Sequence, residues 1–544
     1  MLEGASSRTQ ATSEHPVGGA PPPESHGPSP GRAFATGFTW AALLIASYLF
    51  RLPPLLNARS TNSDAAVVGL QAMHLLRGEH SAFLWGSGYQ TSADAYVAAL
   101  FFAVFGATPL VLMLSALTLH VIATALVFAT LRRRLEPWTA FVLTLPLVLA
   151  PSSIHTYALY PPRQLSITLA VASFWAVHGA SKRSGAAARL WLAGGGALYT
   201  LAISADPYPM VLAPVLLAYA ALVALPRPLE RFLPLVTGLF AGLLPFVMLR
   251  QAPRASTGQL GLTTSVVAHN WDLLVRECLP WALSYKVYFA HNVMDYRPWN
   301  APFLVWCIGV AGAVITFAIV AIALASVRKD LIPRSSRLLG FFGAASWIVT
   351  LAAFLASVMV MDHFSMRYLA VLTVTLPFAT VPVAHLLGRA RVATLLAPHV
   401  IASAIGGWVG YGPFVHGLVP VRETPELRDD YTLLALLDER KITIAEADYW
   451  TSYRLTFLFN ERVVVVPTNL AEDRYPPYRK VFEDAHTFAH VFDPNRSRED
   501  LTATERALGE ANAAVEKTAA GGLTVFLVTR APVARPTDEN DVPR

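Results

Sequence analysis

Long stretches without charge constrain this chain more than any other feature of its sequence. Residues 338–361, for example, contain no Asp, Glu, Lys or Arg. A helix of about 20 apolar residues crosses the hydrocarbon core of a bilayer, which is roughly 30 Å thick. In the whole chain 14% of the residues are charged, whereas a soluble protein carries about a quarter. The sequence therefore predicts a mainly α-helical, polytopic membrane protein.

The pattern of apolar stretches predicts about eleven transmembrane spans. We place them at residues 34–56, 108–131, 137–159, 164–180, 190–205, 208–225, 232–249, 301–327, 338–361, 368–387 and 392–412. Alternate short loops together hold 14 Lys and Arg residues, and the longer loops on the other side hold fewer. Because basic loops stay in the cytoplasm, the charges predict a cytoplasmic N-terminus and an extracytoplasmic C-terminus. The net charge of +6 thus reports membrane orientation and does not indicate a nucleic-acid partner.

Composition divides the chain into a disordered cytoplasmic N-terminal segment, a membrane domain, a small extracytoplasmic α/β domain and a disordered tail. These parts are residues 1–33, 34–412, 413–531 and 532–544. The membrane domain has two large outer loops, residues 57–107 and 250–300. The α/β domain is recognised by its charge, because 20 of the residues 421–480 are Asp, Glu, Lys or Arg.

Within the outer domain, two short strand-like stretches with a helix-like stretch between them predict a compact βαβ unit. We expect strands at residues 442–447 and 462–467, a helix at 451–459 between them, and a last strand at 522–528. Residues 448–450 resemble a junction between a strand and a helix. The outer domain is therefore not expected to supply catalytic groups.

The first outer loop contains the most conspicuous polar candidate. Asp64 is the first acidic residue after the first span, and an amphipathic helix follows it. Because carboxylates are costly in lipid, one held just outside the membrane is a candidate for chemistry. Further along the loop, Asp94 begins an apolar run, residues 95–105, that is too short to cross a bilayer. We expect this run to form a helix in the outer interface.

Several stretches of this loop follow one another in a characteristic order. They are Asp64, Leu76-Arg77-Gly78-Glu79, Gly88-Tyr89 and the apolar run that ends at Phe105-Gly106. The order resembles that of polytopic glycosyltransferases with the GT-C fold that use polyprenyl-phosphate sugars. This group includes the dolichyl-phosphate-mannose protein mannosyltransferases (glycosyltransferase family 39) and the lipid A aminoarabinose transferase. Later stretches agree with the resemblance, namely Met366-Arg367-Tyr368-Leu369, Tyr449 to Leu455 and Arg474-Tyr475-Pro476-Pro477-Tyr478.

The resemblance implies an inverting hexosyl- or pentosyltransferase at the outer face of a bacterial inner membrane. It would move a sugar from a polyprenyl-phosphate donor to a hydroxyl of a glycolipid, a polysaccharide or a protein. Asp64 would be the general base, and Asp94 is the second catalytic candidate. Outer-face cations would hold the phosphate. The expected substrate-binding residues are Arg367 and Arg163, then Lys286 and Arg297, together with Tyr89 and Glu79.

One departure from the group's pattern bears on the cofactor. Many members carry Asp-Glu in the first loop, whereas here Ala65 follows Asp64. The sequence therefore does not identify the second carboxylate of the group's pattern. No cofactor and no metal ligand is assigned from the sequence, and a divalent metal remains an option.

Several candidates also have purely structural interpretations. Asp64 and Asp94 could each cap the helix that it begins. Glu79 could be a turn residue, and Arg367 could be an anchor at the membrane interface. His74, on the polar side of the first-loop helix, is expected to be solvated.

Two other functions remain open. One is a transporter or flippase for a lipid-linked saccharide. Such proteins usually place ionisable residues in the middle of the membrane, and the interiors of the predicted spans lack Asp, Glu, Lys and Arg. The other is a non-catalytic assembly protein whose outer domain binds a partner.

Overall fold

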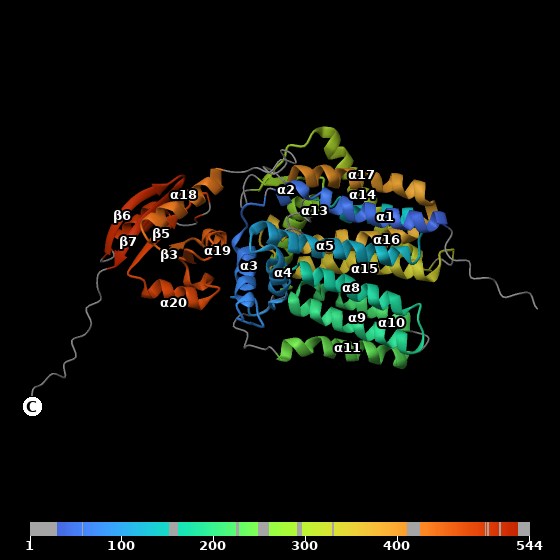
Figure 1. Cartoon of the computed structure of the whole chain (residues 1–544). Coiled ribbons are helices and arrows are strands. Elements are labelled where there is room, and N and C mark those ends of the chain that lie inside the picture. Colours follow the sequence, from blue (N-terminus) through green and yellow to red (C-terminus); the bar gives the residue numbers. More distant parts are fainter. Residues whose placement is uncertain are drawn as a thin grey trace, which may run out of the picture.

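The computed structural model describes residues 30–56, 58–151, 161–224, 228–248, 261–290, 296–328, 331–410, 425–495, 497, 500–510 and 513–530. They form two units, a bundle of helices and a C-terminal α/β domain of residues 425–530. Figure 1 shows the long helices running side by side. The C-terminal domain lies beyond one end of the bundle, which we call the domain-facing end (Figure 1).

Most of the bundle consists of α-helices. They are α1 (Pro30–Leu49), α2 (Leu52–Leu56), α3 (Ser63–Leu76), α4 (Ala93–Phe105), α5 (Pro109–Arg132), α6 (Pro137–Val148), α8 (Gln164–Ala180), α9 (Gly185–Ala205), α10 (Ala213–Ala224), α11 (Pro228–Met248), α12 (Thr264–Leu273), α13 (Leu279–Ala282), α14 (Phe303–Ala325), α15 (Arg334–Ala356), α16 (Ala370–Leu387) and α17 (Arg389–Gly410). Short helical turns η1 (Tyr208–Leu212), η2 (Leu274–Cys278), η3 (Ser326–Arg328) and η4 (His363–Leu369) join some of them. The antiparallel strands β1 (Tyr288–Ala290) and β2 (Tyr296–Pro298) form a small hairpin.

The bundle confirms the predicted polytopic helical class but not the number of eleven spans. In the part of the chain that the structure describes, 6 helices are long and apolar enough to cross a membrane. They are Pro109–Arg132, Gly185–Ala205, Phe303–Arg328, Arg334–Ala356, His363–Leu387 and Arg389–Gly410. Some of the other predicted spans are shorter helices, such as α6 with 12 residues. Pro146 lies close to the end of α6, where it cannot donate a backbone hydrogen bond.

Glycines allow two of the long helices to pack backbone against backbone. A Cβ atom on Gly238 of α11 would lie 1.9 Å from the carbonyl oxygen of Ala193 in α9. A Cβ atom on Gly196 would lie 2.2 Å from the carbonyl oxygen of Leu235. Small residues at such crossings are typical of helices that associate in a bilayer.

Two shorter helices, α3 and α4, occupy the domain-facing end of the bundle (Figure 1). The predicted apolar helix is present as α4, and it exposes Leu100, Val104 and Phe105. Its neighbour α3 differs from the expected amphipathic helix, because almost all of its residues are buried. The reason is tertiary, since α4 covers one side of α3 and the C-terminal domain covers another.

The C-terminal domain is a five-stranded sheet with helices. Its strands have the order β4-β3-β5-β7-β6. They are β3 (Ile444–Ala447), β4 (Val464–Pro467), β5 (Thr487–Phe492), β6 (Ala513–Ala520) and β7 (Leu523–Arg530). The helices are α18 (Pro425–Glu439), α19 (Tyr449–Leu458), α20 (Pro476–Asp484) and α21 (Leu501–Glu510), with the turn η6 (Leu470–Glu472). The pairing of β3 with β4 is parallel and α19 connects them, so the predicted βαβ unit is confirmed.

The C-terminal domain packs directly on α3. A Cβ atom on Gly69 of α3 would lie 2.7 Å from the ring of Phe457 in α19, so only glycine fits there without movement. The backbone N–H of Arg454 donates to the hydroxyl of Ser63 at 3.3 Å. An apolar cluster that includes Val68, Phe457 and Tyr478 continues from the bundle into the domain. The first outer loop is therefore held between the two units.

Candidate active site

Asp64 lies in the first turn of α3, but it is not the residue that caps this helix. The cap is Asn62, whose Oδ1 accepts the backbone N–H of Ala65 at 2.8 Å. Asp64 is also the exposed residue in a stretch that is otherwise largely buried. The capping interpretation of Asp64 is therefore wrong, and its carboxylate is available for another task.

The hydroxyl of Tyr449 contacts this carboxylate from the C-terminal domain. It donates a hydrogen bond to Asp64 Oδ1 at 2.5 Å. Tyr449 begins α19, directly after the residue that caps this helix, Asp448, whose side chain accepts the N–H of Trp450 at 3.0 Å. Burial raises the pKa of Tyr449 well above its usual value, and the charge of Asp64 acts in the same direction. The phenol therefore keeps its proton and acts as the donor.

Arg474 is a second group of the C-terminal domain near Asp64. Its guanidinium carbon lies 5.2 Å from the centre of the Tyr449 ring, and its Nη1 donates to the carbonyl oxygen of Gly86 at 3.1 Å. Gly86 has φ +66°, and a Cβ atom on it would lie 2.3 Å from Arg474 Cδ. Burial lowers the pKa of Arg474, but the neighbouring Tyr449 and Asp64 outweigh this and raise it. Arg474 thus brings a permanent positive charge to the candidate base.

Tyr89 lies in the first loop together with Asp64. Burial raises the pKa of its phenol, and the charges of Arg163, Asp206 and Asp64 all act on it. The Tyr368 phenol contributes as well. Hydrogen bonds of the two following residues attach this part of the loop to the end of α9: Gln90 Nε2 donates to Asp206, and the backbone N–H of Thr91 donates to the carbonyl oxygen of Ser204 at 3.1 Å.

Arg163 is held by an acidic residue that sequence reasoning missed. Its Nε donates to Asp206 Oδ2 at 2.9 Å, and Gln90 Nε2 donates to the same oxygen. The other oxygen of Asp206 accepts the backbone N–H of Tyr208 at 2.8 Å. A usable signal was present in the sequence, because Asp206 directly follows a predicted span and falls on the same side as Asp64.

Asp94 is a buried carboxylate that holds the backbone at Arg163 by hydrogen bonds. It is 5% exposed, and its two oxygens accept the backbone N–H groups of Arg163 at 3.3 Å and of Leu165 at 3.4 Å. Burial raises its pKa to about 6, although these hydrogen bonds oppose the rise. Asp94 therefore stabilises the beginning of α8 and does not cap its own helix, whose N-cap residue is Ser92.

Arg367 differs from Arg163 in lacking an acidic partner. Its guanidinium carbon lies 5.2 Å from the centre of the Tyr368 ring, and its Nη2 is 3.4 Å from the Tyr368 hydroxyl. Its Nε is buried without a hydrogen-bond partner, and it forms no ion pair with any residue that the structure describes. The Tyr208 hydroxyl donates to the carbonyl oxygen of Tyr368 at 2.9 Å, which connects this turn to the Asp206 segment.

The remaining predicted binding residues are placed differently. Glu79 accepts hydrogen bonds from His74 and from the Tyr475 hydroxyl, each at 2.8 Å, in the contact between the two units. Lys286 forms an ion pair with Glu277 at 2.8 Å. The side chain of Arg297 lies outside the described part of the chain. Neither Glu79 nor Lys286 has a contact with Arg163 or Arg367 among those that the structure describes.

His74 contradicts the expectation of a solvated side chain, because it is 6% exposed. Its Nδ1 bonds Glu79, and its Nε2 bonds Glu461 at 2.6 Å. The Tyr478 hydroxyl is 3.3 Å from the same Nε2. Glu461 also pairs with Arg77, at 2.5 Å. The sequence could not indicate this burial, because Glu461 lies 387 residues further along the chain.

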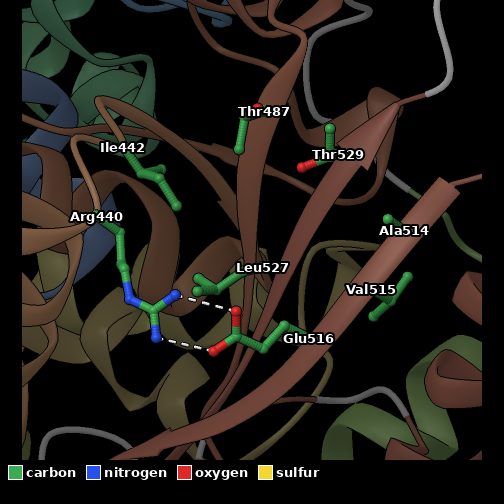
Figure 2. A pocket seen from close by; sticks show the side chains of 8 residues that line it. All are labelled: Arg440, Ile442, Thr487, Ala514, Val515, Glu516, Leu527 and Thr529. Atoms are coloured by element: carbon green, nitrogen blue, oxygen red, sulfur yellow. Dashed lines mark hydrogen bonds and ion pairs between the residues drawn. The ribbon is translucent and has the colours of Figure 1, made fainter.

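Possible metal ligands and a surface hollow were the other places where a site could lie. Over the described ranges, no group of three or more His, Cys, Asp or Glu side chains is arranged to hold a metal ion. A shallow hollow on the C-terminal sheet is lined by Arg440, Thr487, Glu516 and Thr529, among others (Figure 2). Figure 2 shows Arg440 paired with Glu516 across it, at 2.8 and 3.0 Å. None of the predicted site residues lines this hollow.

Comparison with known proteins gives information on the fold. No protein-family model matches the sequence, and no curated protein matches it either. Among solved structures, the chain is similar to ArnT from Cupriavidus metallidurans bound to undecaprenyl phosphate, with a TM-score of 0.56 and 16% identity. This match covers 92% of the chain and 100% of ArnT. The apo state of the same protein matches with a TM-score of 0.50 and 15% identity, covering 90% and 98% of the two chains. The chain therefore has an ArnT-like GT-C fold.

Proposed function

We propose that this protein is an inverting membrane glycosyltransferase that uses a polyprenyl-phosphate sugar. The acceptor is a hydroxyl group presented at the outer face of a bacterial inner membrane. The fold supports this proposal, because the similar ArnT structure is bound to undecaprenyl phosphate. Fold alone does not define function, so the argument depends on the residues of the site.

The observation that carries the proposal is the connection between the loop of Asp64 and the turn of Arg367, two outer segments of the bundle. Gln90 of the first loop donates to Asp206, and the Tyr208 hydroxyl donates to the carbonyl oxygen of Tyr368, directly after Arg367. A transferase of this type needs one carboxylate for the acceptor and cations for the departing phosphate. The connected segments supply both kinds of group, the carboxylate of Asp64 and the guanidinium of Arg367.

Asp64 suits the task of general base. Tyr449 occupies its Oδ1, while Oδ2 accepts no hydrogen bond from the described residues. In the proposed reaction the acceptor oxygen forms a bond to the anomeric carbon, and the bond from that carbon to the phosphate oxygen breaks. The acceptor proton goes to Asp64, and the bonding electrons leave with the polyprenyl phosphate. A direct displacement of this kind inverts the anomeric centre, whereas retention needs a nearby nucleophilic carboxylate.

Arg367 suits the phosphate better than Arg163 does. The charge of Arg163 is already shared with Asp206 at 2.9 Å, whereas Arg367 has no carboxylate partner among the described residues. A buried, unpartnered guanidinium nitrogen is costly, and an incoming phosphate oxygen would satisfy it. In this proposal Arg367 binds the donor phosphate, and Arg163, paired with Asp206, holds the neighbouring segment in place.

The orientation in the membrane is part of the same proposal. The basic residues Arg132, Arg133 and Lys182 lie where α5 and α8 end, away from the turns that carry Arg163 and Arg367. The positive-inside rule would place those basic ends in the cytoplasm. The candidate site and the C-terminal domain would then lie on the extracytoplasmic side.

The test is transfer of radiolabelled sugar from a panel of polyprenyl-phosphate donors, in membranes that contain the wild-type protein or its Asp64→Asn variant. We expect transfer by the wild type and its loss in Asp64→Asn, while the variant still binds the donor. Asp272→Asn is a matched control, because Asp272 is an exposed carboxylate paired with Arg276. Absence of wild-type transfer from every donor, with an acceptor-rich lipid extract supplied, would contradict the proposal.

A further inference from the structure

The candidate base receives its hydrogen bond from a different structural unit. Asp64 belongs to the first loop of the bundle, whereas Tyr449 and Arg474 belong to the C-terminal domain. We propose that Tyr449 and Arg474 are positioning residues for Asp64, so that the transferase site is complete only with the C-terminal domain docked. This inference rests on the proposed function and concerns how its base is held.

Tyr449 is built as a rigid donor. Its side chain is 5% exposed, and its ring packs edge-to-face against Trp450 and Tyr453, with centroids 5.1 and 5.8 Å away. Asp64, in contrast, is exposed, and an exposed carboxylate near a helix start samples several rotamers. A hydrogen bond from a fixed phenol to Oδ1 selects one orientation of the carboxylate and directs Oδ2 away from the phenol.

Arg474 also helps to hold Tyr449 next to Asp64. Its guanidinium bonds the Gly86 carbonyl in the first loop and lies over the Tyr449 ring. Its own backbone N–H donates to the Tyr453 hydroxyl at 2.6 Å. Arg474 therefore joins the turn at Gly86 to the beginning of α19, the two segments that must stay in register for Tyr449 to reach Asp64.

The docking of the domain does not depend on the Tyr449 hydroxyl. The apolar cluster around Phe457 and Tyr478 covers α3, and His74 and Glu461 bond across the same contact. Removal of one phenolic oxygen should therefore leave the domain docked and the protein folded. This separation makes a clean test possible.

The test measures kcat and the KM for the donor in Tyr449→Phe, using the full chain in membranes. We expect kcat to fall by about tenfold to a hundredfold, the range that misplacement of a reacting group produces. The KM for the donor should stay near the wild-type value, because Arg367 and Arg163 are on the bundle. The rates are divided by the amount of folded protein. A variant that only folded less well would then show an unchanged kcat per folded molecule, whereas a misplaced base lowers it.

Tyr431→Phe is the matched control, since Tyr431 is 49% exposed on α18 of the same domain. It should leave both constants unchanged. Arg474→Gln is a second test variant, which should lower kcat while the Tyr449 ring remains in place. Unchanged kcat in both Tyr449→Phe and Arg474→Gln, in an enzyme that Asp64→Asn inactivates, would overturn this inference alone. Absence of any wild-type transfer would overturn the proposed function and this inference with it.

Discussion

The Tyr449 hydroxyl donates a hydrogen bond of 2.5 Å to Asp64 Oδ1, across 385 residues of sequence and between two structural units. The first loop of the bundle and the first turn of α19 thus meet at one carboxylate. Asp64 and Tyr449, which belong to two of the stretches that carry the family resemblance, are in direct contact. The predictions below separate the roles of the carboxylate, the cations and the contact between the units.

Asp64→Asn should lower kcat by about a hundredfold to ten-thousandfold, because the amide cannot accept the acceptor's proton. The asparagine side chain can still accept the hydrogen bond from Tyr449, so folding should be preserved. Steady-state transfer of labelled sugar measures the effect, and retention of labelled donor on the protein serves as the folding control. A kcat within a factor of two of wild type would remove Asp64 as the base.

Arg367→Ala should weaken donor binding by about tenfold to a hundredfold, the value of one charge-assisted hydrogen bond. Arg367→Lys should lose less, because lysine keeps the charge but not the planar fork of donors. Donor affinity can be measured with labelled polyprenyl phosphate. Arg276→Ala, at an exposed arginine paired with Asp272, is the control and should bind normally. Equal donor affinity in Arg367→Ala and wild type would exclude Arg367 as the phosphate ligand.

The contact between the units should weaken at alkaline pH. Burial lowers the pKa of His74, but its bonds to Glu461 and Glu79 outweigh this and raise it above 6.5. Its stabilising contribution is therefore fully present below pH 6.5 and is lost as the pH rises through the raised pKa. Burial raises the pKa of Glu461, yet its bonds to His74, Tyr478 and Arg77 lower it to about 2. Its contribution is present above pH 4.5 and is lost as the pH falls toward 2.

Protease protection of the C-terminal domain across this pH range checks the prediction. Protection should be greatest between pH 4.5 and pH 6.5, and it should decline as the pH rises further. His74→Gln should remove most of the alkaline decline, since glutamine does not titrate. His80→Gln is the control, because His80 is an exposed histidine of the same loop that bonds Tyr96. An alkaline decline that persists unchanged in His74→Gln would refute the role of His74.

Gly69→Ala should destabilise the docked structure by about 1–3 kcal/mol through overpacking. The new methyl group would lie 2.7 Å from the Phe457 ring, which is itself stacked with Phe102 at 6.0 Å and cannot easily move. Gly194→Ala is the matched control, because nothing lies within 4 Å of a Cβ atom there. That control should be neutral or stabilising by about 0.5–1 kcal/mol. The midpoint temperature of thermal unfolding should therefore fall in Gly69→Ala, whereas in Gly194→Ala it should stay the same or rise.

The sequence by itself determined the class of the protein and several of its elements. Uncharged stretches predicted the membrane helices, the run from residue 95 to 105 predicted α4, and the strand-like and helix-like stretches of the outer domain predicted β3, α19 and β4. It also singled out Asp64, Arg163 and Arg367. These features follow from neighbouring residues, because hydrophobic partitioning and backbone hydrogen bonding in a helix or strand are governed by local pattern.

The tertiary structure decided which of these residues meet. It buried His74 against Glu461, paired Arg163 with Asp206 and brought Tyr449 to Asp64. It also made α3 a buried helix, although its own sequence is that of a half-exposed one. Such contacts depend on the docking of units far apart in sequence, and the covering surface is not encoded in the local pattern of the segment that it covers. Burial and partner choice therefore required the folded chain, whereas helix, strand and membrane preference did not.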